Sequence, residues 1–334
     1  MEKNKCVSNW LFTVAFMVFA MAVIGAITRL TESGLSIAEW KPLSGALPPL
    51  NVAEWERVFA LYKDTPQYRE VFSGMTLAEF KGIFWWEWIH RFWGRIIGLA
   101  FALPMLWFWA RGALTPRLKR LSVILLLLGG LQGAVGWFMV ASGLVDQPSV
   151  SHYRLALHLG LALFLFAMLL YTGLIARQTP QVEVKRGLRA HGVATLGMLT
   201  LTIIWGAFVA GLDAGRIYNE WPLMGGHFLP AEAGDMLPLW LNAFENHALV
   251  QFIHRWLAVI TAVMVLALAL RSRRVTPKLA LALGLMALVQ PLLGIVTLLT
   301  NVHVHVAATH QAGGIILLGL MVGWLYRAQS ERRT

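Results

Sequence analysis

Apolar residues dominate eight long stretches of the chain, and polar residues gather in the connections between them. A helix that crosses the hydrocarbon core of a bilayer needs about 20 mostly apolar residues. The expected spans are residues 10–27, 83–110, 121–141, 152–176, 191–212, 248–270, 278–300 and 304–326. The pattern therefore predicts an all-α, polytopic membrane protein with eight transmembrane helices.

Composition agrees with this prediction, since 57% of the residues are hydrophobic and only 13% are charged. The mean hydropathy of +0.62 excludes an ordinary soluble domain. We expect the first span to be retained as a helix. It is too long for a cleavable signal peptide and lacks a small-residue cleavage site.

Basic residues occupy alternate connections and both ends of the chain. They are Lys3, Lys5, Arg111, Arg117, Lys119, Arg120, Arg177, Lys185, Arg186, Arg189, Arg271, Arg273, Arg274, Lys278, Arg327, Arg332 and Arg333. Short loops rich in Lys and Arg stay in the cytoplasm, so both termini are expected there. The net charge of +11 then reflects topology and attraction to the anionic lipid bilayer, and it does not predict nucleic-acid binding.

Two long connections, residues 30–82 and 213–247, fall on the opposite side. Cys6 is the only cysteine, so no internal disulfide or iron–sulfur cluster can form, and these loops must hold their shape by packing. Helical spacing of apolar residues in the first loop predicts short helices at the membrane interface. The residues concerned are Trp55, Val58, Phe59 and Tyr62, and then Leu77 and Phe80.

The second half of the chain repeats the first. The matched motifs are Gly25-Ala26, Glu32-x-Gly34, Glu39-Trp40, Ile89-His90-Arg91, Gln132-x-x-x-Gly136 and His158 in the first half, and Gly206-Ala207, Asp213-x-Gly215, Glu220-Trp221, Ile253-His254-Arg255, Gln290-x-x-x-Gly294 and His310 in the second. The alternative is a chance similarity between hydrophobic segments. It is weakened because many of the matched residues are polar, Gly or Trp. We expect two four-helix bundles, residues 1–180 and 181–334, related by a pseudo-twofold axis along the membrane normal.

Four histidines, His90, His158, His254 and His310, lie at similar depth in four of the spans. Each is about six to eight residues inside the outer end, or about 10 Å at 1.5 Å per residue. Histidine is costly in a membrane, and imidazole is a usual ligand of haem iron. The pattern predicts two haem sites, one in each half. The alternative is that each ring only hydrogen-bonds a neighbouring helix.

The other histidines favour an interfacial role. His152, His191, His247, His303 and His305 lie at span ends, and His227 lies in a loop. Because His152 and His303 occupy nearly equivalent places in the repeat, a role at a haem edge or in proton transfer stays open for them.

The clearest difference between the halves lies three residues before the first histidine of each pair. Glu87 stands there in the first half and Gln251 in the second. A carboxylate on the histidine face of its helix suits a pocket in which positive charge develops or a proton leaves. The alternative is a structural ion pair with Arg91 or Arg95.

These residues resemble the haem A synthases of bacterial and mitochondrial inner membranes, over nearly the whole chain. The most specific segments are Glu87-Trp88-Ile89-His90-Arg91-Phe92-Trp93-Gly94-Arg95, Thr31-Glu32-Ser33-Gly34-Leu35-Ser36-Ile37-Ala38-Glu39-Trp40, His254-Arg255 and Thr309-His310-Gln311. One branch of that family carries a cysteine pair in the first outer loop. This chain is similar to the cysteine-free proteobacterial and mitochondrial branch.

The resemblance implies an oxidoreductase of the bacterial inner membrane that converts the C8 methyl of haem O to a formyl group by successive hydroxylations. The product, haem A, would supply cytochrome c oxidase. It also implies haem O as substrate on the iron ligands His90 and His158, protohaem (haem b) as cofactor on His254 and His310, and Glu87 as the catalytic carboxylate. Candidate partners are haem O synthase, oxidase assembly factors and a second copy of the chain. The electron partner is not identified.

Two histidine ligands would leave no free position on the substrate iron. Either one histidine leaves during turnover, or electrons are withdrawn from the macrocycle and water attacks the resulting cation, which Glu87 would stabilise. A rival reading is a dihaem electron carrier that oxidises quinol, which shares the four histidines but does not explain Glu87. A transporter predicts equivalent helix breaks in both halves, whereas Pro104 and Pro291 are not equivalent.

Overall fold

A computed structural model describes residues 2–39, 44–143 and 148–331, and these residues form eight helices long and apolar enough to cross a membrane. The helices are α1 (Glu2–Leu30), α4 (Leu77–Ala110), α5 (Pro116–Gly143), α6 (His152–Arg177), α7 (Arg186–Gly211), α9 (His247–Ser272), α10 (Pro277–Leu299) and α11 (Val304–Arg327). The prediction of an all-α protein with eight spans is confirmed. Of the residues discussed above, Trp40, Arg332 and Arg333 lie outside the described ranges.

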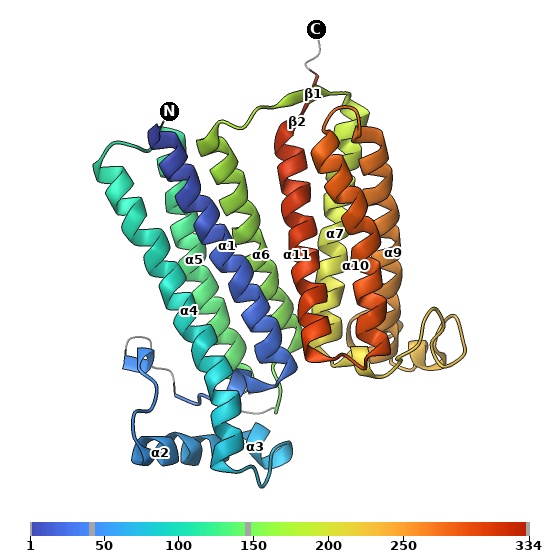
Figure 1. Ribbon diagram of the computed structural model, residues 1–334. Helices are drawn as coiled ribbons and strands as arrows, with labels where there is room; N and C mark the ends of the chain where they lie inside the picture. Colours follow the sequence, from blue (N-terminus) through green and yellow to red (C-terminus); the bar gives the residue numbers. More distant parts are fainter. Residues whose placement is uncertain (1, 40–43, 144–147, 332–334) are drawn as a thin grey trace.

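The eight helices stand side by side in two groups of four (Figure 1). Helices α1, α4, α5 and α6 form one group, and α7, α9, α10 and α11 form the other. The groups meet where α6 packs against α7 and α11, and where α1 packs against α11. The first helix begins and the last helix ends at the same side of the molecule. The boundary at residue 180 and the pseudo-twofold axis stay predictions.

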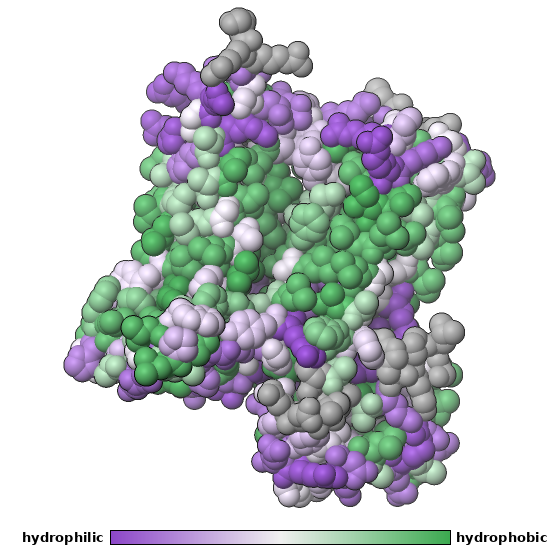
Figure 2. Space-filling model, turned by 180° about the vertical axis from the view of Figure 1, so that it is seen from behind, coloured by the Kyte–Doolittle hydropathy of each residue, from purple (hydrophilic) through white to green (hydrophobic). Residues whose placement is uncertain are grey.

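On the face that Figure 2 shows, apolar residues cover the middle of the helical bundle and hydrophilic residues cover both ends. Many leucines on α4, α5 and α10 contribute to this outward apolar surface, with more than half of each side chain exposed. Examples are Leu103, Leu106, Leu127, Leu281, Leu285 and Leu292. A soluble protein rarely exposes so much contiguous apolar surface, whereas lipid covers it at no cost.

Helix α4 begins six residues earlier than the predicted residue 83. Thr76 and Glu79 form a capping box in which the Thr76 hydroxyl accepts from the Glu79 backbone N–H and the Glu79 carboxylate accepts from the Thr76 N–H. This cap satisfies donors that the first turn leaves free. The prediction of a separate short helix at Leu77 and Phe80 is therefore wrong, because both residues belong to the first turns of α4.

The other short helix of the first outer loop is confirmed as α2 (Val52–Lys63), and α3 (Pro66–Glu70) follows it. An aromatic cluster packs α2 against the start of α4 and consists of Trp55, Phe59, Tyr62, Phe80 and Phe84. Burial raises the pKa of Tyr62, which keeps its phenol a neutral donor to Gln67 at 3.0 Å. Packing thus holds the loop without a disulfide, as predicted.

The remaining elements are short. They are η1 (Ser33–Leu35), η2 (Ser44–Ala46), η3 (Ala214–Arg216), η4 (Ala231–Gly234), η5 (Leu239–Leu241), α8 (Asn242–Glu245), β1 (Val182–Val184) and β2 (Ala328–Ser330). Strands β1 and β2 pair in parallel at the end where the first helix begins. Local periodicity did not predict this pair, because three-residue strands form only when tertiary packing brings them together.

The repeat is visible in the backbone at the ends of α1 and α7. Each helix is followed by an acidic residue in the left-handed conformation, Glu32 with φ of 54° and Asp213 with φ of 52°. The short 3-10 turns η1 and η3 come next. Non-glycine residues rarely adopt this conformation, so its recurrence at matched positions supports the duplication.

Candidate functional site

The structure brings the four predicted histidines together as two pairs, each within one group of helices. His90 on α4 and His158 on α6 lie close enough to interact electrostatically, and so do His254 on α9 and His310 on α11. All four residues are partly buried. Their role as iron ligands stays a prediction.

Each imidazole rests against a glycine of a neighbouring helix. A Cβ atom added at Gly136 would lie 2.9 Å from His158 Cε1, and one added at Gly294 would lie 3.0 Å from His310 Cε1. On the other side of each pair, a Cβ at Gly206 would come within 2.9 Å of His254. At Gly25 the corresponding distance, to His90 Nε2, is 3.3 Å. These four glycines, the glycine seats, make room for the rings. A side chain at Gly136 or Gly206 would have to shift the ring, and one at Gly25 or Gly294 would make an unusually tight contact with it.

Two glutamines complete the surroundings of the second histidine in each pair. Gln132 Nε2 lies 3.2 Å from His158 Nδ1 and donates to the His158 carbonyl at 3.1 Å. Gln290 Nε2 lies 3.2 Å from His310 Nδ1 and donates to its carbonyl at 2.7 Å. Each glutamine precedes a glycine seat by four residues, which places both on one helix face.

Gln132 and Gln290 occupy corresponding positions in the repeat, but the sequence alone predicted no role for them. Their i, i+4 spacing to Gly136 and Gly294 was a usable signal, because it predicts that amide and glycine face the same neighbour. Mutation of a residue that orients a metal-binding histidine typically costs about 10–100-fold in metal affinity.

His254 has a further hydrogen bond, because its Nδ1 lies 3.0 Å from the Thr202 carbonyl oxygen. A carbonyl can only accept, so Nδ1 carries the proton and Nε2 is left with its lone pair. This is the usual orientation of a metal-ligating imidazole. The paired rings, their glycine seats and this tautomer fit a haem iron held between two histidines.

Glu87 is 2% exposed and its carboxylate accepts three hydrogen bonds. The Ser36 hydroxyl and the Ile37 backbone N–H donate to Oε2 at 2.7 Å each, and Arg91 donates to Oε1 at 2.5 Å. Arg91 also donates to the Ile37 carbonyl at 3.1 Å. The ion pair that we considered as an alternative is therefore present, and its partner is Arg91. It ties the first outer loop to α4 beside His90.

The second half uses the matched residues for the same tether without a carboxylate. Gln251 Nε2 donates to the Tyr218 carbonyl at 3.0 Å, and Arg255 donates to the same oxygen at 2.8 Å. Tyr218 corresponds to Ile37 in the repeat. Loop attachment thus needs a polar side chain at this place, but it does not need the negative charge that Glu87 adds.

Two of the other histidines contact groups at the ends of helices. His152 is buried where α6 meets α7, with its Nε2 3.7 Å from a Glu245 carboxylate oxygen. His191 Nδ1 lies 2.9 Å from an Arg271 nitrogen at the opposite end of the bundle. These positions agree with contacts between helix ends, and no role in haem binding follows from them.

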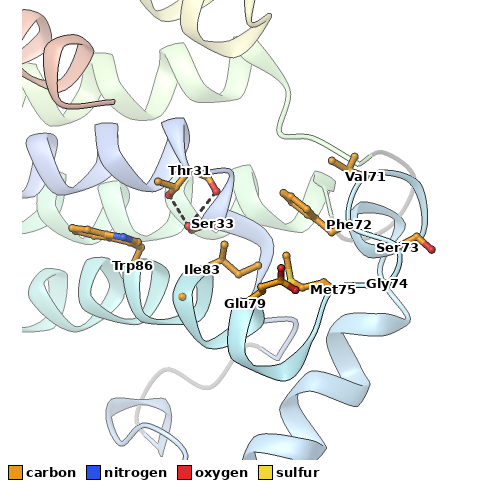
Figure 3. A pocket seen from close by; sticks show the side chains of 11 residues that line it. Thr31, Ser33, Val71, Phe72, Ser73, Gly74, Met75, Glu79, Ile83 and Trp86 are labelled. Carbon is orange, nitrogen blue, oxygen red and sulfur yellow. Dashed lines mark hydrogen bonds between the residues drawn. The ribbon is translucent and has the colours of Figure 1, made fainter. Parts of the chain in front are cut away.

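An open cavity of about 660 Å³ lies between the first outer loop and the start of α4. Figure 3 shows Glu79, Ile83 and Trp86 on its α4 side, with Thr31 and Ser33 hydrogen-bonded to each other nearby. None of the four paired histidines lines it. Residues 79, 83 and 86 follow helical spacing towards residue 90, so the cavity lies on the His90 side of α4.

Comparison with known proteins shows the family of this chain. The family model COX15-CtaA, described as a cytochrome oxidase assembly protein, matches residues 8–322. The chain belongs to this family. That match includes all four histidines, the four glycine seats, both glutamines and Glu87.

Several curated relatives are similar over nearly their whole length, and each is named heme A synthase. The relative from Rhodospirillum centenum is 53% identical over 96% of this chain and 88% of its own length. The relative from Maricaulis maris is 48% identical, over 98% and 97% respectively. The relative from Parvibaculum lavamentivorans is 46% identical, over 97% and 94%.

Proposed function

We propose that this chain is a haem A synthase, a membrane oxidoreductase that oxidises a methyl group of haem O to the formyl group of haem A. Its family and the names of its relatives support this function. The observation that carries the proposal is a difference between the two halves. Each half has a histidine pair packed against two glycines, and among the described residues the first pair alone has a buried carboxylate, Glu87, beside it. A quinol-oxidising dihaem carrier would need both pairs but no such charge.

We assign haem O to His90 and His158, and protohaem to His254 and His310. Glu87 supports the assignment, because the substrate site must promote chemistry on the porphyrin edge and the other site must only carry electrons. When bound, the protohaem supplies one-electron transfer to and from the reacting half.

Within the substrate half, Glu87 is the catalytic residue. Its two oxygens accept from Ser36, Ile37 and Arg91, so the carboxylate is fixed before the substrate arrives. A preorganised negative charge stabilises positive charge that develops nearby without a cost of reorientation. His90 on α4 and His158 on α6 would hold the haem, and their glycine seats fix the rings.

We further assign the protein to the bacterial inner membrane with both termini in the cytoplasm. The basic connections between α4 and α5, α6 and α7, and α9 and α10 all lie at the end where α1 begins. The positive-inside rule places that end in the cytoplasm. Haem O synthase, oxidase assembly factors and a second copy of the chain are the proposed partners.

Haem extraction tests the function directly. The chain is expressed in cells that make haem O and in matched cells that make only protohaem, and the extracted haems are separated. We expect a formyl haem only in the first case, and its yield should depend on Glu87. Protein that binds haem in both cell types but never yields a formyl haem would be the quinol-oxidising carrier instead.

A further inference from the structure

Gln311 directly follows His310 on α11, and its side chain reaches across to the other half of the molecule. Its Nε2 donates to the backbone carbonyl of Ala22 on α1 at 2.7 Å. Ala22 is 8% exposed, so this hydrogen bond lies where little water can replace it. The ligand-bearing helix of one half is thereby fixed to the first helix of the other.

The acceptor lies one helical turn from a glycine seat. Gly25 follows Ala22 by three residues, which places both on neighbouring parts of the same α1 face. Gly25 is the residue against which His90 rests. A short path of contacts therefore runs from His310 through Gln311, Ala22 and Gly25 to His90.

Other polar contacts between the halves lie nearer the ends of the bundle. At the outer end, Arg29 pairs with Asp213 at 2.5 Å, and Tyr153 donates to Glu245 at 2.6 Å. Towards the inner end, the Tyr326 hydroxyl donates to the Leu174 carbonyl at 3.1 Å. Among the described residues, Gln311 makes the side-chain hydrogen bond between the halves at the depth of the histidines.

The repeat does not require this amide. Leu159 follows His158 at the place that corresponds to Gln311, and it packs against the hydrophobic core. The corresponding position in the first half is therefore filled by an apolar residue. The amide of Gln311 adds a directional link on one side only, from the second histidine pair towards the first.

We propose that Gln311 is a positioning residue that couples the two haem sites. A haem in the second pair would hold His310, and Gln311, through its hydrogen bond to Ala22, would carry that constraint to α1, where Gly25 lies against His90. Occupancy of the protohaem site thus prepares the substrate site. This inference rests on the haem assignment proposed above, and it deepens that assignment by naming how the two sites communicate.

The test is a thermodynamic cycle of four purified full-length proteins: wild type, His254→Ala, Gln311→Leu and the double variant. Each is prepared from cells without haem O and titrated with haem O, with low-spin absorbance as the readout. We expect His254→Ala to weaken haem O binding by about 5-fold or more when it is introduced into the wild type. When it is introduced into the Gln311→Leu protein, the weakening should be less than about 2-fold. Equal weakening in both backgrounds, or no weakening in either, overturns the proposal.

Controls separate coupling from damage. Tyr326→Phe removes another hydrogen bond between the halves. In this background, His254→Ala should weaken haem O binding by the same factor as it does in the wild type. Gln311→Met, similar in length but without a donor, replaces Gln311→Leu if the latter fails to fold. In both Gln311 variants the protohaem spectrum of the second pair should be normal. If His90→Ala binds haem O as tightly as wild type, the assignment of haem O to this site is wrong, and the coupling falls with it. If His254→Ala weakens haem O binding equally with and without Gln311→Leu, the coupling alone is overturned.

Discussion

Gly136 on α5 lies so close to His158 on α6 that a Cβ atom there would come within 2.9 Å of the ring. The same relationship joins Gly294 to His310, at 3.0 Å. Real Cβ contacts are essentially never as short as the first distance, and the second is tighter than nearly all of them, so in both places a larger residue must shift the ring or part the helices. The orientation of each predicted ligand therefore depends on a residue with no chemistry of its own.

Replacing Gly294 with Ala should lower the protohaem content of the purified protein, and Gly136→Ala should lower haem A output while protohaem stays. The added methyl group forces the imidazole away from its bound orientation. Haem-to-protein ratio and the low-spin spectrum measure the effect. Gly133→Ala is the matched control on α5, because nothing lies within 4 Å of its added Cβ. Equal behaviour of Gly133→Ala and Gly136→Ala would show that the seat is irrelevant.

His254→Ala and His310→Ala should each remove protohaem from the purified protein. Each residue is assigned as one of two axial ligands, and alanine offers no donor in its place. Optical spectra and haem extraction measure the loss. A normal low-spin spectrum in both variants would contradict the assignment of this pair.

His90→Ala and His158→Ala should retain that protohaem and abolish haem A formation. The two pairs lie in different groups of helices, so loss of one pair leaves the other intact. Product analysis of extracted haems, alongside the protohaem spectrum, tests both halves at once. Loss of every haem in these variants would point to one shared site or to misfolding.

Glu87→Gln should insert, fold and bind both haems, because Gln251 already holds the equivalent loop through its amide. Haem A formation should fall about 10²–10³-fold, the usual effect of removing one preorganised electrostatic group, or roughly 3–4 kcal/mol. Turnover in membranes with haem O supplied measures it. Glu54→Gln is a control, since that carboxylate forms an exposed ion pair with Arg57. Unchanged output from a well-folded Glu87→Gln protein would eliminate Glu87 as the catalytic carboxylate, and failure to fold would favour a structural ion pair.

Gln290→Met should weaken protohaem binding about 10–100-fold, because the ring of His310 loses the amide that orients it. Gln132→Met should weaken haem O binding to a similar degree while leaving protohaem in place. Titration of haem-depleted protein gives both affinities. An affinity equal to wild type in each variant would mean that the glycine seats alone orient the rings.

The sequence by itself determined the spans, the depth of the four histidines and the internal repeat. A membrane helix must satisfy its own backbone hydrogen bonds, so apolar length alone predicts where the chain crosses. The i, i+3 spacing of Glu87 and His90 is equally local. The capping box of Thr76 and Glu79 was also local, and the predicted start at residue 83 missed it because apolar content there is lower.

Only the tertiary structure decided which groups meet across helices. Ser36 lies 51 residues from Glu87, and Gln311 lies 289 residues from Ala22, so no local pattern predicts either contact. The same holds for Gln132 and Gly136. Their spacing in the sequence predicts that they share a helix face, but their contact with His158 depends on how α5 packs against α6. Periodicity reports which face of a helix is apolar or polar, whereas the partner of that face is set by packing among all eight helices.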